Sequence, residues 1–60
     1  MNYYVEIKTK NNGVIELVFS NATDLQRYID SLSESEKDRI ITVHKNENGR
    51  YIQAWDDIII

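Results

Sequence analysis

One amphipathic helix is predicted near the middle of the chain, and it limits the folds that this sequence can adopt. Within the stretch Ser20–Leu32, apolar side chains recur at helical spacing and form one stripe. The stripe comprises Leu25, Tyr28, Ile29 and Leu32, with Ala22 one turn earlier. A helix of about three turns is not stable alone in water, so the stripe must be buried against other elements. We expect Leu25 and Ile29 to lie deepest in the core.

Short polar residues mark the start of this helix and of a second helical turn. Ser20 or Asn21 can accept hydrogen bonds from the first free backbone N–H groups, and Asp24 suits the positive end of the helix dipole. Ser33 and Glu36 have the spacing of a capping box. One further helical turn is therefore predicted after the main helix.

A first β-hairpin is predicted before the helix. Alternating residues over Asn2–Lys10 and Val14–Phe19 indicate two strands, and Asn11-Asn12-Gly13 is a turn signal between them. A three-residue loop with Gly13 in the left-handed region gives the most coherent register. It pairs Val5 with Phe19, Ile7 with Leu17 and Thr9 with Ile15, and it sets Lys8 opposite Glu16.

A second hairpin is predicted after the helix. Arg39–Lys45 is rich in β-branched residues, Asn46–Gly49 is a turn signal, and Arg50 to about Ile58 is the return strand. A four-residue loop brings apolar residues together on both faces. The resulting pairs are Val43 with Ile52, Ile41 with Ala54, Ile40 with Trp55, and His44 with Tyr51.

The order of these elements predicts an α+β fold of β-β-α-β-β type. We expect one four-stranded antiparallel sheet built from the two hairpins, with the amphipathic helix packed on one face. A chain of 60 residues forms a single small domain, residues 1–60. Two hairpins can join side by side in more than one order, and the sequence leaves the strand order open.

Composition narrows the class of protein. The chain has no cysteine, so neither a disulfide nor a thiolate–zinc site can reinforce its small core. It shows no signal peptide and no apolar run of membrane-spanning length, so we expect a cytoplasmic protein with no membrane partner. The apolar segment Ile58–Ile60 should pair within the sheet or with another chain, which favours a homodimer.

The sheet face away from the helix is the predicted partner-binding surface. An exposed sheet face is normally polar, yet this one is expected to carry the only tryptophan and several other aromatic or aliphatic residues. Its predicted binding residues are Tyr4, Ile40, His44, Tyr51, Gln53 and Trp55. Trp and Tyr are enriched at binding hot spots, so the surface should bind a protein partner or a second copy. The alternative is that the sheet curls and Trp55 belongs to the core.

The sequence fits two other classes of function, nucleic-acid binding and catalysis, less well. Lys8, Lys10, Lys45 and Arg50, together with the aromatic residues, could form a stacking platform for single-stranded nucleic acid, although the net charge of −3 opposes it. We expect no enzyme, cofactor or metal site, because His44 has no second histidine, cysteine or nucleophile to work with. Asp56 and Asp57 would point to opposite faces of a strand. The sequence therefore predicts a non-catalytic interaction module, an inhibitor or adaptor by analogy with small acidic proteins of phages and mobile elements.

Overall fold

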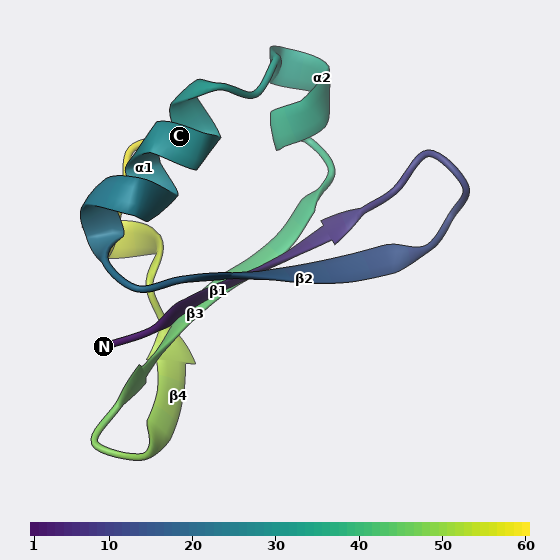
Figure 1. Ribbon diagram of the computed structural model, residues 1–60. Coiled ribbons are helices and arrows are strands. Elements are labelled where there is room, and N and C mark those ends of the chain that lie inside the picture. The colour runs from purple at the N-terminus through teal and green to yellow at the C-terminus, as the bar shows by residue number, and fades with distance from the viewer.

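The computed structural model describes all residues, 1–60, and has the predicted α+β architecture. The strands are β1 (Tyr3–Lys8), β2 (Val14–Phe19), β3 (Ile40–Glu47) and β4 (Arg50–Gln53). Two helices, α1 (Ala22–Asp30) and α2 (Glu34–Lys37), separate the hairpins, and a 3₁₀ turn, η1 (Trp55–Asp57), follows β4. All neighbouring strands are antiparallel, in the order β2-β1-β3-β4, so the hairpins join through β1 and β3 (Figure 1).

The first hairpin has the predicted loop length, but the loop begins one residue earlier than expected. The Thr9 N–H donates to the Gly13 carbonyl at 2.9 Å, which leaves Lys10–Asn12 as the three loop residues. Asn12, and not Gly13, adopts the left-handed conformation, with φ 62°. The predicted pairing of Val5 with Phe19 is wrong, because Val5 lies opposite Leu17.

Two hydrogen bonds within the turn explain this register, one to a side chain and one to the backbone. The Thr9 hydroxyl accepts a hydrogen bond from the Gly13 N–H, and the Thr9 carbonyl accepts from the Asn12 N–H. Asparagine tolerates the left-handed region, so Asn12 can close the turn. The register moved by two residues, and each side chain therefore stays on the face that the alternation predicted.

The second hairpin turns on two residues, and the predicted four-residue loop is wrong. Asn48 and Gly49 both have positive φ, 55° and 82°, as a type I′ turn requires. The Asn46 side chain accepts a hydrogen bond from the Gly49 N–H at 3.0 Å. A type I′ turn matches the twist of the strands, and this match decides the register. Glu47 consequently lies opposite Arg50, and His44 opposite Gln53.

Strand β4 is shorter than predicted. It ends at Gln53, where the sequence suggested an end near Ile58, and the chain then enters the 3₁₀ turn η1. The Asp57 and Ile58 N–H groups donate to the carbonyls of Ala54 and Trp55 in this turn. Asp56 and Asp57 therefore lie in a turn rather than on opposite faces of a strand.

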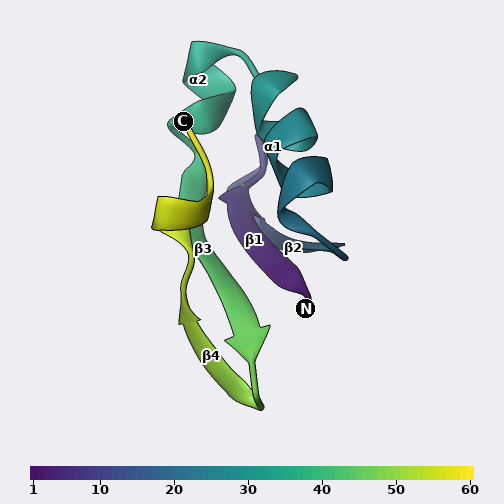
Figure 2. The same cartoon turned by 90° about the vertical axis from the view of Figure 1, so that its left-hand side faces the viewer.

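Helix α1 forms as the sequence predicts and is capped by Asn21. The Asn21 side chain accepts from the Asp24 N–H at 2.8 Å, and Leu25 and Ile29 are fully buried. The Ser33–Glu36 capping box is present at the start of α2. Both helices lie on the same side of the sheet, which we call the inner side (Figure 2).

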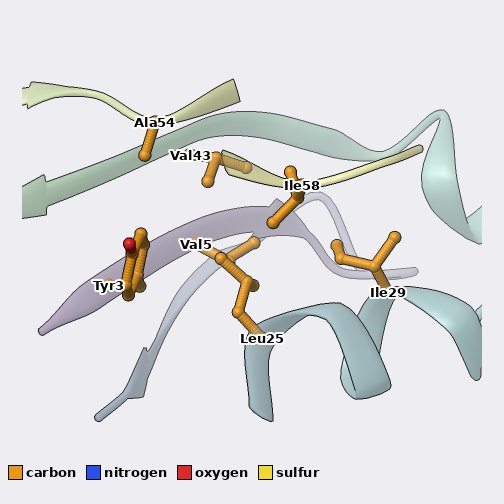
Figure 3. Close-up of a cluster of buried hydrophobic side chains, with 7 residues drawn as sticks. All are labelled: Tyr3, Val5, Leu25, Ile29, Val43, Ala54 and Ile58. Carbon is orange, nitrogen blue, oxygen red and sulfur yellow. The ribbon is translucent and has the colours of Figure 1, made fainter. Parts of the chain in front are cut away.

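The hydrophobic core lies between α1, the inner face of the sheet and the C-terminal segment (Figure 3). It comprises seven buried residues: Tyr3, Val5, Leu25, Ile29, Val43, Ala54 and Ile58. Ile58 is thus buried over the inner face of the sheet, and the segment Ile58–Ile60 does not continue as a strand. The expectation that this segment pairs within the sheet is wrong, because η1 turns the chain back over the inner face.

The side chain of Gln26 fixes this C-terminal segment to α1. Its Oε1 accepts from the Ile59 N–H and its Nε2 donates to the Ile59 carbonyl, each at 2.7 Å. Lys37 donates to the main-chain oxygen of Ile60 at 3.1 Å. Gln26 therefore gives Ile59 the donor and acceptor that a neighbouring strand would have supplied. None of the helices has the length and apolar character that crossing a membrane requires.

Candidate interaction surface

The outer face of the sheet, opposite α1, carries a cluster of three aromatic rings. The rings of Tyr4 and His44 are stacked, with centroids 5.2 Å apart and planes 14° apart. Tyr51 meets both rings edge-on, with centroids 5.5 Å from Tyr4 and 5.6 Å from His44. We call Tyr4, His44 and Tyr51 the aromatic cluster. Such edge-on and stacked contacts hold the rings in defined positions.

The strand register brings the cluster together from three strands. Tyr4 of β1 lies directly opposite His44 of β3, and His44 lies opposite Gln53 of β4. On the other side Tyr4 lies opposite Val18 of β2, which completes one row across the sheet. Tyr51 is two residues from Gln53 along β4 and therefore diagonal to His44, within reach of an aromatic side chain.

Trp55 borders this row although it lies beyond the end of β4. Its indole N–H donates to the Gln53 side-chain oxygen at 2.9 Å. The residue is 38% exposed and is not a member of the core cluster. The alternative that Trp55 belongs to the core is therefore wrong.

Ile40 is the one predicted site residue that lies on the inner face of the sheet. A β-bulge shifts the register between Glu6 and Ile7, so that Thr42 faces Glu6 while Ile40 faces Ile7. Ile41 is the additional residue at this bulge. Ile40 therefore turns inward and packs against the hydrophobic core. No local sequence signal marks the bulge, so simple alternation placed Ile40 on the wrong face.

Charged residues occupy the other half of the outer face. Glu6 lies directly opposite Glu16, and Lys8 lies opposite Val14. Like charges at directly opposed positions destabilise a strand pair. The outer face thus has an aromatic half near the second hairpin and a mixed, partly acidic half toward the tip of the first hairpin.

Two of the four predicted basic residues of a nucleic-acid platform stand on the inner side. Lys45 donates to the Asp57 carboxylate at 2.7 Å and is only 16% exposed in its side chain. Arg50 is opposite Glu47, at an inner-face position of β4. Of that set, only Lys8 stands at an outer-face strand position, and Lys10 lies in the adjacent loop.

Asp57 joins Tyr3 and Lys45 in a polar cluster that sequence reasoning missed. Its Oδ2 accepts from the Tyr3 hydroxyl at 2.9 Å as well as from Lys45. The two hydrogen bonds, first that from Lys45, lower the pKa of Asp57 from its ordinary value of 3.8. The same bonds raise the pKa of Lys45 and of Tyr3. No short-range pattern links residues this far apart, so only the tertiary fold reveals the cluster.

A shallow groove of about 390 Å³ lies between α1 and the segment after β4. Its walls are Ala22, Thr23 and Gln26 on one side and the run 56–59 on the other. Asp57 is held by Tyr3 and Lys45, and Gln26 is held by Ile59. No group of three or more histidine and carboxylate side chains is arranged to hold a metal ion. Two of the polar side chains that line the groove, Gln26 and Asp57, are thus already hydrogen-bonded within the chain.

Comparisons of the chain with protein-family models, with curated proteins and with solved structures find no match.

Proposed function

We propose that the protein is a non-catalytic interaction module that binds a protein partner through the outer face of its sheet. The observation that carries this proposal is the aromatic cluster, which the fold assembles from three strands on the side away from α1. The binding residues are Tyr4, His44, Tyr51, Gln53 and Trp55. Ile40 is not among them, because it packs against the core.

The chemistry of the cluster suits a protein partner. Tyr51 is 64% exposed and Trp55 38% exposed, and large aromatic residues with a polar end are the most frequent hot-spot residues. Their contacts with neighbouring rings and with Gln53 already restrict the side chains. A partner would therefore order few additional rotamers on binding, which lowers the entropic cost of association.

Single-stranded nucleic acid is the less favoured ligand for the same face. Base stacking needs open ring faces and nearby cations. Tyr4 and His44 already use one face each against the other, and Lys45 is bound to Asp57 on the inner side. Glu6 and Glu16 would in addition repel the phosphate backbone. These contacts support a protein ligand.

An inhibitor or adaptor is the role that fits such a module best. A domain of 60 residues with net charge −3 offers one recognition face on a minimal scaffold, as small acidic proteins of phages and mobile elements do. We place it in the cytoplasm, where a cysteine-free fold needs no oxidising compartment.

The experiment that tests the proposal is site-specific photo-crosslinking in cell extract treated with nuclease. A photoreactive residue replaces Tyr51 in one variant and Arg27, which is exposed on α1, in a matched control. We expect a discrete protein adduct at position 51 that is lost on Trp55→Ala, and no such adduct at position 27. Equal crosslinking at both positions, or adducts only with a second copy of the chain, would contradict binding of a foreign partner by this face.

Salt dependence separates the two ligand classes. Protein binding through the aromatic cluster should change little between about 50 and 200 mM salt, whereas several phosphate contacts would weaken binding by orders of magnitude. A ligand that nuclease destroys and whose binding depends steeply on salt would be nucleic acid, and the proposed protein partner would then be wrong.

A further inference from the structure

Strand β2 is an open edge of the sheet with unpaired backbone groups. It pairs with β1 on one side only. The Thr9 N–H bonds to the Gly13 carbonyl, and hydrogen-bonded pairs alternate along an antiparallel ladder. Ile15, Leu17 and Phe19 therefore bond to β1. The N–H and C=O groups of Val14, Glu16 and Val18 point away from the sheet.

This edge has only one of the features by which natural edge strands avoid pairing, the charge of Glu16. Its six residues contain no proline and no lysine, and its register with β1 is free of bulges. Apolar side chains are exposed on both faces of the strand: Val14 and Val18 are each 55% exposed, and Ile15 is 46% exposed. The other edge, β4, has four residues and ends in the turn η1. The sheet therefore has one short edge, β4, and one longer edge, β2, on which a further strand can pair.

We propose that β2 pairs antiparallel with β2 of a second copy, with Leu17 opposite Leu17. Two equivalent copies related by a two-fold axis perpendicular to the sheet keep their outer faces on the same side. Each residue must then lie opposite a residue whose side chain points to the same face of the sheet. If Glu16 stood on the axis it would face Glu16 of the second copy, which like charges disfavour. With Leu17 on the axis, Glu16 faces Val18 and Ile15 faces Phe19.

Charge complementarity supports a second copy as the occupant of this edge. In the Leu17-centred register, Gly13 of one copy comes opposite Asn21 of the other. The tip of the first hairpin, which carries Lys10, thereby reaches the beginning of α1, where Asp24 lies in the first turn. The two-fold axis generates this contact twice. The chain thus offers its own edge an apolar centre at Leu17 and, at each end, a lysine near Asp24, whose 3.4 Å contact with Arg27 the new contact would share or replace.

The β2–β2 pairing does not use the aromatic cluster, but it determines how the clusters of the two copies are placed. The two sheets become one continuous sheet, with both copies of α1 on one side. Both aromatic clusters then face the same direction on the other side, where a single partner or a repeated one can contact them together. The proposal goes beyond the proposed function and does not rest on it.

A matched pair of substitutions at Val18 tests both the interface and its register. In the Leu17-centred register, Val18→Glu sets two carboxylates opposite each other at two symmetric places, whereas Val18→Lys sets a lysine opposite Glu16 at both. We expect the dimer dissociation constant to rise by roughly 2- to 30-fold for Val18→Glu and to fall by a similar factor for Val18→Lys. The measurement is sedimentation equilibrium from about 10 μM to 1 mM chain.

Amide hydrogen exchange provides a second, substitution-free measurement. The amides of Val14, Glu16 and Val18 should become protected as the concentration rises, while Tyr51→Ser should leave the dimer unchanged. A chain that stays monomeric throughout, or a dimer that the two Val18 substitutions weaken equally, would overturn the proposal. A dimer that dissociates on Tyr51→Ser would also overturn it, since association would then use the aromatic cluster. If the dimer forms but no protein adduct appears at position 51, only the proposed function is contradicted.

Discussion

The two faces of this sheet both carry large side chains but differ in what lies over them. On the inner face Val5 and Val43 are fully buried under α1 and Ile58. On the outer face the rings of Tyr4, His44 and Tyr51 cover one another, and Tyr51 stays 64% exposed. The inner face therefore accounts for stability, and the outer face is available for binding.

Polar groups on the two faces also differ in their pairing. Asp57 on the inner side accepts hydrogen bonds from Tyr3 and Lys45. On the outer face Glu6 lies opposite Glu16, a pair that a partner cation could relieve. A surface that is selected only for stability would place opposite charges at such a position. The inner side thus pairs its carboxylate with hydrogen-bond donors, whereas the outer face sets two carboxylates opposite each other.

The largest effect is expected from truncation of the inner face. Leu25→Ala removes a fully buried side chain at the centre of the core and should lower the free energy of unfolding by roughly 2–5 kcal/mol. Urea denaturation measures the change. Arg27→Ala on the exposed side of the same helix is the control and should stay within about 0.5 kcal/mol of the wild type. Equal losses for both variants would contradict the assigned faces of α1.

A smaller loss should follow from releasing the C-terminal segment. Gln26→Ala removes both hydrogen bonds to Ile59 and should lower the free energy of unfolding by about 1–2 kcal/mol. The Ile59 amide should then exchange with solvent faster. Gln53→Ala, which changes a glutamine on the outer face, should leave the exchange of Ile59 unchanged.

The polar cluster on the inner side should make stability depend on pH. Because the pKa of Asp57 is lowered on folding, its contribution is present above the ordinary value of 3.8 and is lost as pH falls through the lower folded value. The pKa values of Lys45 and Tyr3 are raised, so their contributions are present below pH 10 and are lost at more alkaline pH.

Asp57→Asn should flatten both ends of this profile, which chemical denaturation at a series of pH values records. Glu36, whose pKa the Ser33 backbone N–H lowers, contributes to the acid end as well and should keep part of that slope. Asp38→Asn, at an exposed carboxylate, serves as the control. An unchanged profile for Asp57→Asn would show that the cluster is not formed in solution.

The smallest effect on stability is expected on the outer face. Tyr51→Ser removes one exposed ring and its edge-on contacts with Tyr4 and His44, and should lower the free energy of unfolding by less than about 1 kcal/mol. Trp55→Ala should behave similarly if its role is recognition. A loss of roughly 3–5 kcal/mol for Trp55→Ala, measured by the same urea titration, is typical of a buried side chain and would contradict a role in recognition.

The sequence alone determined the elements and most of the faces. The spacing of Leu25 and Ile29 specified the buried side of α1, and Asn21 and Ser33 marked both helix starts, because caps and apolar stripes are local features. Both hairpin registers were predicted two residues away from the observed ones. The faces survived this error, because a strand repeats every two residues.

Tertiary structure decided the strand order, the bulge beside Ile40, the return of Ile58 to the core and the cluster around Asp57. Each depends on contacts between residues far apart in the chain. The I′ turn at Asn48–Gly49, a local feature, set where β4 begins, whereas the turn η1 ended β4 at Gln53 and took the chain inward. Local pattern cannot supply these results, because Ile58 is buried only where α1 and the inner face of the sheet together form a surface that receives it.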